Sequence, residues 1–272
     1  MLRWISLAVT AGAALVGAGV ALGVGPWPGL ATGVRSPDGQ LRYTAARSEA
    51  ATVVRAVRLG SGAAVVAKVT LDGAWGIPAI TSTGVAGGLS PDGRTLVLSE
   101  PATYSGLRST SKFLVLSTRT LAVEKTIALP GEFGFDALSP DRRTMFVIQH
   151  RKRADLVAYV VRAYDLASDR LLPGTVVAKG ETGSMRGYPV SRATGNRGSW
   201  VYTLYNRGNG APFIHALNTV RRSAVCIDLP DVAERDVWTM RLALTPDGRR
   251  LLVRSGEGQA LARVDTKTLR VL

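Results

Sequence analysis

Short runs of apolar and β-branched residues, separated by polar turns, recur along the chain from about residue 30. Five of these runs occupy residues 40–44, 95–99, 144–148, 200–204 and 251–253. Several are apolar at successive positions, which is typical of strands covered on both faces. We take each of these runs as the second strand of a repeated unit. Runs for a third and a fourth strand follow it each time, although the last unit ends in the stub Arg270-Val271-Leu272. The pattern predicts repeated four-stranded antiparallel units.

A recurring turn sequence precedes these runs. Ser36-Pro37-Asp38-Gly39 returns at 90–93, at 139–142 with Arg142 in place of Gly, and at 245–248 with Thr245 in place of Ser. A degenerate copy lies near Ser191, so turns are expected near residues 36, 90, 139, 191 and 245, a period of roughly 50 residues that is typical of a propeller blade. Pro fixes φ at the second turn position, and Gly accepts the positive φ after Asp. With Arg142 in place of Gly, the third turn should therefore be a little strained or differently closed.

The repeats predict an all-β fold, a β-propeller of about five four-stranded blades over residues 32–272. A single blade cannot bury both of its faces, so neighbouring blades must stack. The last strand is short and the first unit lacks a clear partner strand. We therefore expect either that residues 30–34 close the ring of blades or that the ring is closed imperfectly. Segment 156–165 also fits a helical stripe, but its β-branched valines and its place in the repeat favour a strand.

Residues 1–31 predict export. Ile5–Val24 has no charged residue, and it follows a short basic start and precedes Gly25-Pro26-Trp27-Pro28. This stretch fits a secretory signal peptide, and it is also long enough to remain as an N-terminal membrane anchor helix of about 20 residues. Both interpretations place residues 32–272 outside the cytoplasm, either secreted or tethered to the outer face of the cytoplasmic membrane.

The turn sequences also carry a family resemblance. "LSPDGRTLVLSE", "LSPDRRTMFVIQH" and "LTPDGRRLLVRSG" resemble repeats of bacterial propellers of the WD40-like, TolB-like and YVTN type. "YTLY", "PFIHALNT" and "AVCIDLP" are similar to a blade of secreted, uncharacterised actinobacterial propellers. The resemblance implies the fold and leaves function open, because propellers host many unrelated activities. The Trp-Asp strand ends of true WD40 repeats are absent, which makes a eukaryotic-style scaffold role less apt.

Composition excludes several classes of function. The net charge is +14, but the arginines are scattered and aromatic residues make up only 6% of the chain, so we expect no nucleic-acid partner. The single cysteine, Cys226, excludes an intramolecular disulfide framework and is expected to pack as a small apolar residue. Two histidines without metal-ligand spacing and the absence of a Gly-x-Ser-x-Gly sequence predict no metal, no cofactor and no serine nucleophile.

Propeller topology predicts where a ligand would bind. The loops between the second and third strands share one face, here called the loop face, with the loops between blades, and the Ser-Pro-Asp turns lie on the opposite turn face. We expect ligand contacts on the loop face from Tyr104, Arg108, Glu132, His150, Arg151, Lys152, Arg153, Glu181, Arg235 and Glu257. The basic run 151–153 is either a solvated loop or a contact for an anionic envelope polymer or lipid head groups.

Two functions remain open from the sequence. The first is a monomeric, non-catalytic binding or scaffold module of the cell envelope, whose partner is an unknown protein or an anionic envelope polymer. Residues 5–24 could add membrane association. The alternative is a hydrolase or lyase acting on a carbohydrate or lactone, which would need two carboxylates at the separation used by glycosidases. Glu132, Glu181 and Glu257 are the candidates for that pair.

Overall fold

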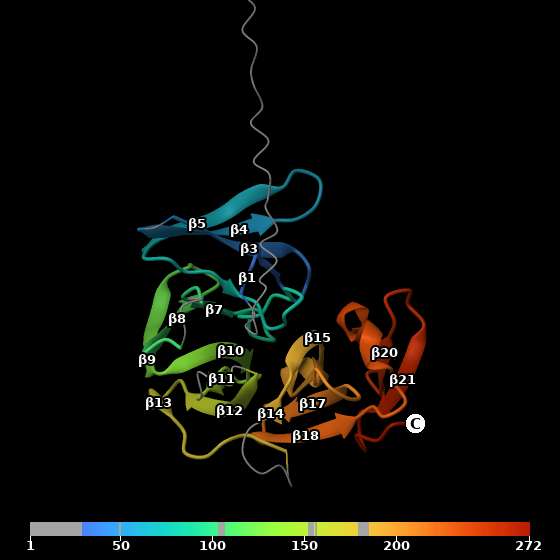
Figure 1. The fold of residues 1–272 in the computed structure, drawn as a ribbon. Helices are drawn as coiled ribbons and strands as arrows, with labels where there is room; N and C mark the ends of the chain where they lie inside the picture. Colours follow the sequence, from blue (N-terminus) through green and yellow to red (C-terminus); the bar gives the residue numbers. More distant parts are fainter. Residues whose placement is uncertain (1–28, 49, 103–106, 152–154, 156, 179–184) are drawn as a thin grey trace, which may run out of the picture.

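The computed structural model describes residues 29–272 except 49, 103–106, 152–154, 156 and 179–184. The expected signal peptide or anchor helix therefore lies outside the described residues. Within the described part of the chain, no helix is long and apolar enough to cross a membrane. The described chain instead forms five antiparallel blades, arranged one after another around a common axis (Figure 1), and a small two-stranded sheet of residues 30–31 and 77–78.

The blades follow the chain order from first to last. Blade 1 contains β2 (Val34–Arg35), β3 (Leu41–Arg47), β4 (Ala51–Arg58) and β5 (Ala64–Asp72). Blade 2 contains β7 (Thr95–Ser99), β8 (Thr110–Ser117) and β9 (Val123–Pro130). Its inner position is filled by the irregular segment 76–89, which includes β6 (Ile77–Pro78) and pairs with β1 (Leu30–Ala31).

Blades 3 and 4 are the most complete. Blade 3 contains β10 (Glu132–Leu138), β11 (Thr144–His150), β12 (Ala158–Asp165), β13 (Arg170–Leu171) and β14 (Met185–Arg186). Blade 4 contains β15 (Tyr188–Gly195), β16 (Trp200–Asn206), β17 (Phe213–Asn218) and β18 (Ser223–Asp228). The ambiguous segment 156–165 is thus largely strand β12, as predicted. Cys226 is half-buried in β18 and packs against the core between these two blades.

Blade 5 is shorter than the others. It contains β19 (Arg241–Leu244), β20 (Arg250–Arg254) and β21 (Ala260–Asp265), and its fourth strand is reduced to a bridge between Val264 and Val271. A 3₁₀ segment, η2 (Glu234–Thr239), leads into it from blade 4. The stub at the end of the sequence therefore has the edge position that the repeat predicts.

The four clear turn repeats share one hydrogen-bond pattern. In the third turn, the Ser139 hydroxyl donates to Asp141 at 2.5 Å, and Asp141 accepts the backbone N–H of Arg143 at 3.0 Å. Ser139 Oγ also accepts the Thr144 N–H at 2.9 Å, which closes the hairpin. Arg142 keeps this pattern only by adopting a left-handed φ of 59°, the conformation for which glycine is favoured, and the predicted strain follows from it.

The fourth repeat departs from the prediction. Ser191 does not lie in a turn but is buried within β15, and the hairpin turn of blade 4 is the 3₁₀ segment η1 (Asn196–Gly198). Ser191 Oγ accepts the backbone N–H of Leu242 at 2.9 Å and so joins blade 4 to blade 5. The degenerate sequence was misleading because a serine can satisfy a neighbouring strand as well as a local turn.

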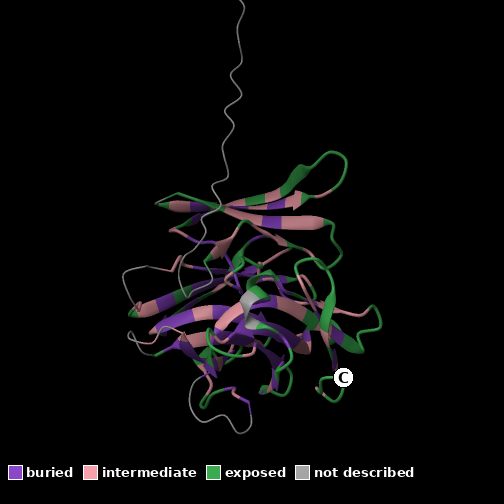
Figure 2. Ribbon diagram, turned by 45° about the vertical axis from the view of Figure 1, so that its right-hand side comes forward, coloured by how far each residue is buried: buried purple, intermediate pink, exposed green. Residues whose placement is uncertain are grey.

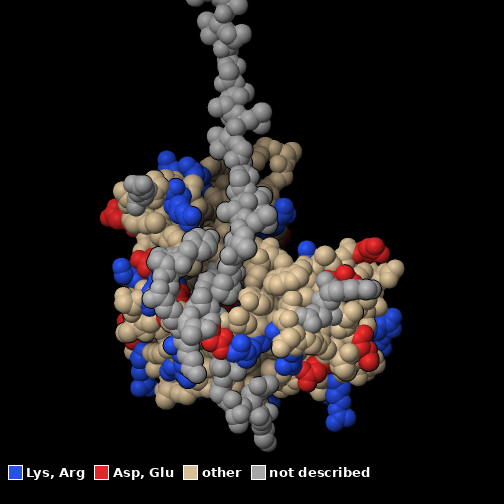
Figure 3. Space-filling view, in the orientation of Figure 1, with Lys and Arg blue, Asp and Glu red and all other residues tan. Residues whose placement is uncertain are grey.

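Four hydrophobic clusters join the five blades in sequence, and Figure 2 shows the buried residues concentrated where blades meet. No buried cluster among the described residues joins blade 5 to blade 1, and the surface is hollowed between these two blades (Figure 3). The expected closure through residues 30–34 is not seen. β1 and β2 instead join blades 2 and 1, so the ring is closed imperfectly.

A hairpin-like excursion of blade 2 crosses the centre of the ring. It spans residues 79–86 and reaches blade 4, where the Ser82 N–H donates to Pro189 O at 2.7 Å. The Thr83 hydroxyl donates to Val190 O at 2.6 Å. There is a cavity on each side of this excursion, and Ile80, Phe135 and Asp136 line both of them. The excursion therefore divides the central channel into two cavities.

Candidate functional site

The first cavity opens at the loop-face end of the central channel and has a volume of about 60 Å³. Strand β1 and blades 2, 3 and 4 build it, and none of its described lining residues comes from blade 5. Its apolar walls include Leu30, Ile80, Phe133, Phe135 and Ile148. Its polar residues are Ser99, Glu100, Arg108, Glu132, Asp136, His150, Tyr159 and Tyr205.

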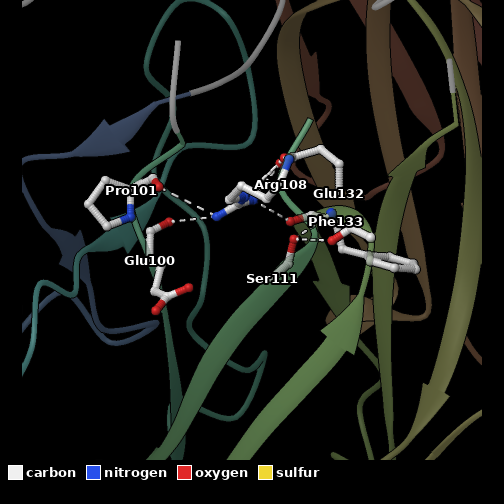
Figure 4. A network of polar contacts seen from close by, with 7 residues as sticks. Glu100, Pro101, Arg108, Ser111, Glu132 and Phe133 are labelled. Atoms are coloured by element: carbon white, nitrogen blue, oxygen red, sulfur yellow. Dashed lines mark hydrogen bonds and ion pairs between the residues drawn. The ribbon is translucent and has the colours of Figure 1, made fainter. Parts of the chain in front are cut away.

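Arg108 and Glu132 form a buried ion pair at the rim of this cavity (Figure 4). The guanidinium donates to Glu132 through Nη2 at 2.5 Å and through Nε at 2.9 Å, and the Arg108 backbone N–H adds a bond of 2.7 Å. Arg108 Nη2 also donates to Phe133 O at 2.9 Å. Ser111 holds the same strand start by accepting the Phe133 N–H at 2.8 Å. This ion pair therefore fixes the loop before β8 to the start of β10.

A second buried ion pair lies deeper in the channel. Arg192, on β15, contacts the Asp136 carboxylate and donates to Asp136 O at 2.6 Å. Arg192 Nε donates to Thr203 at 3.0 Å. Both side chains are almost completely buried, at 6% and 4% exposure. The pair joins the inner strands of blades 3 and 4, because a buried charge is tolerated only when it is paired and hydrogen-bonded.

Three aromatic groups pack beside this pair. The rings of Tyr159 and Tyr205 stack with centroids 5.4 Å apart, and His215 meets Tyr205 edge-on at 6.4 Å. Burial raises the pKa of both tyrosines, so both stay protonated. Burial also lowers the pKa of His215 to about 4; nearby Asp136 favours the charged imidazole, whereas Arg192 opposes it. His215 is therefore neutral at pH 7, and its Nε2 has no hydrogen-bond partner in the described structure.

The structure brings together three of the ten expected site residues, namely Arg108, Glu132 and His150. Arg151 is exposed next to His150, and Glu257 is exposed between β20 and β21, where it lines neither cavity. Arg235 lies in η2. Tyr104, Lys152, Arg153 and Glu181 fall outside the described residues, as does the side chain of Arg235.

Sequence reasoning missed Asp136, Tyr159 and Tyr205, because it searched loops and these residues lie inside strands. The sequence does contain one signal for this site: Asp136 is a charged residue within the otherwise apolar run 133–138. Charged residues are seldom fully buried without a partner, so such a position predicts an internal ion pair.

The carboxylates proposed for hydrolysis do not come together among the described residues. Glu132 is bound by Arg108, and Glu257 is exposed on blade 5, away from the cavity. Glu181 lies outside the described part of the chain. Where the structure is described, no group of three or more His, Cys, Asp and Glu side chains could hold a metal ion.

Comparisons of fold find solved structures similar to this chain, one of them a named β-propeller domain. A functionally unknown protein from Desulfotomaculum acetoxidans superposes with a TM-score of 0.51 at 14% identity, over 83% of this chain and 62% of that one. The Cps50 (Swd1) β-propeller domain of Myceliophteria thermophila gives 0.50 at 12% identity, over 84% and 64% of the two chains. This chain has the β-propeller fold. The propeller thus spans less than two thirds of each of these two structures.

A putative TolB from Agrobacterium tumefaciens is also similar to the propeller, with a TM-score of 0.48 at 16% identity over 91% of this chain and 80% of that one. No protein-family model matches the sequence, and the search for curated relatives found no match. At such low identities the likeness concerns the fold, and function must be argued from the residues of this chain.

Proposed function

We propose that this propeller is an exported, non-catalytic binding module of the cell envelope, and that a protein partner inserts a small apolar side chain into the loop-face cavity. The observation that carries the proposal is the cavity itself: apolar walls, a few fixed polar groups and no unpaired carboxylate among Glu132 and Asp136. Ligand sites commonly combine a mostly apolar concave wall with a few oriented polar groups.

The size and rigidity of the cavity favour a single side chain over a whole small molecule. A volume of about 60 Å³ holds a few water molecules or a short aliphatic group. The ion pair Arg108–Glu132 fixes the rim before any partner arrives, so little ordering entropy is lost on binding. His150 in the cavity wall supplies a polar group that could orient the inserted chain.

Catalysis is disfavoured by the state of the two buried carboxylates. A general acid or base must be able to exchange a proton with the substrate. Each carboxylate is already engaged by an arginine: Arg108 binds both oxygens of Glu132, and Arg192 binds Oδ1 of Asp136. The geometry thus supports holding a partner in place rather than hydrolysis.

Export is supported by the uncharged run 5–24 and by the turn-rich propeller that follows it. We expect the full chain, expressed in a bacterial host, to fractionate outside the cytoplasm, and a chain without residues 1–31 to stay inside. A full-length chain recovered only from the cytoplasm would refute export while leaving the binding proposal intact.

Ligand binding is tested by thermal unfolding of the purified full chain with peptides, glycan fragments, nucleotides and divalent cations. A ligand at about 100 times its Kd should stabilise the protein by about 2.7 kcal/mol. Ile148→Trp, which fills the cavity wall, should abolish the effect of a peptide, whereas Leu261→Trp on exposed β21 should not. Stabilisation only by an anionic glycan, or turnover of a glycan or lactone that Glu132→Gln abolishes, would contradict the proposal.

A further inference from the structure

The second cavity lies at the turn-face end of the channel, behind the excursion 79–86, and has a volume of about 420 Å³. This volume is in the range typical of small-molecule sites. Blades 1 to 4 all contribute to its wall: the turn of blade 1, the segment 86–91 of blade 2, the inner strand β10 of blade 3, and β15 with η1 of blade 4. None of the expected site residues that the structure describes lines this cavity.

The charge of this cavity is positive. Its lining holds three arginines, Arg35, Arg192 and Arg197, and a single acidic residue, Asp136. Arg192 neutralises Asp136 through the buried ion pair described above. Arg35 and Arg197 form no ion pair with any carboxylate of the described structure. Two positive charges on separate blades, 1 and 4, therefore face the cavity without compensation.

The backbone at Arg197 is left-handed, as it also is at Asn196, Arg142 and four other non-glycine residues of the described chain. This residue has φ 52° and ψ 37°, a left-handed conformation that costs an L-residue about 1–2 kcal/mol. The turns of blades 1, 2 and 5 place Gly39, Gly93 and Gly248 at their left-handed position. Asn196, the residue before Arg197, is also left-handed with φ 45°, and two successive left-handed residues are what a tight hairpin turn requires, so this conformation follows from the turn that joins β15 to β16.

We propose that the turn-face cavity binds a small organic anion bearing carboxylate or phosphate groups. Arg35 and Arg197 supply the guanidinium donors, which match the paired oxygens of both groups. Val34, Leu89, Pro91 and Val201 cover the carbon skeleton of the ligand. Arg35 and Arg197 are exposed at the mouth of the cavity, and the two guanidiniums are confined to this one cavity, which favours a small anion over a long polyanion that would need a continuous basic strip.

The test is calorimetric titration of the purified full chain with citrate and with pyrophosphate at fixed ionic strength. We expect saturable binding of at least one of them. Arg35→Gln and Arg197→Gly should each weaken that binding by about tenfold or more, as expected for the loss of one charge-assisted contact. The preferred probe distinguishes a carboxylate ligand from a phosphate ligand.

Arg142→Gly is the matched control. Arg142 is also an arginine in the left-handed region of a turn, with φ 59°, but it lines neither cavity and pairs with Asp92 at the surface. Both arginine-to-glycine changes relieve the same backbone strain, so both proteins should fold, and only Arg197→Gly should lose affinity. No saturable binding, equal affinity in Arg35→Gln, or an equal loss in Arg142→Gly would each overturn the proposal.

Discussion

The buried imidazole of His215 makes a specific prediction about stability between pH 7 and pH 5. Burial lowers its pKa in the folded protein to about 4, from 6.5 in the unfolded chain. The unfolded state therefore binds the proton first as the pH falls, and the stability contributed by neutral His215 is present above pH 6.5 and lost progressively down to pH 4. From pH 6.5 to pH 5 this amounts to 1.5 pH units, or about 2 kcal/mol.

The assay is urea unfolding at pH 7, 6 and 5, followed by tryptophan fluorescence. His215→Phe keeps a ring against Tyr205 but cannot titrate, so its free energy of unfolding should change by about 2 kcal/mol less than that of the wild type over this range. His150→Phe controls for the only other histidine. A wild-type profile as flat as that of His215→Phe would refute the argument that His215 is buried and neutral.

Three further predictions concern the charged groups. Asp136→Ala leaves Arg192 buried without its partner and should cost about 3–5 kcal/mol in chemical unfolding, whereas the double change to leucine at both positions should cost much less; equal losses would argue against a buried pair. Glu132→Ala should destabilise through Arg108, while Glu257→Ala on the exposed loop should not, as measured by Tm. The third prediction concerns the turn aspartates Asp38, Asp92, Asp141 and Asp247. Burial tends to raise the pKa of Asp92 and Asp141, but hydrogen bonds from the turn hydroxyl and the backbone lower the pKa of all four below 3.8. Their stabilisation is therefore present above that pH, and it should be lost in acid unfolding as the pH drops through the lowered values.

The sequence determined the features of this propeller that depend on neighbours in the chain. Ser139, Asp141 and the residues after them close a hairpin by local hydrogen bonds, so a repeated turn sequence predicts a repeated strand pair wherever it occurs. Five blades, their order and the grouping of Arg108, Glu132 and His150 at one end of the channel follow from that period and from propeller topology.

The tertiary structure alone decided what depends on contacts between blades. Ser191 resembled a turn residue, but its hydroxyl oxygen accepts the backbone N–H of Leu242 in the next blade, some 50 positions along the chain. The pairing of Asp136 with Arg192, the excursion 79–86 across the channel and the imperfect closure of the ring likewise join residues distant in sequence. Local patterns set the strand period, but the free energy of these contacts exists only after the blades have packed together.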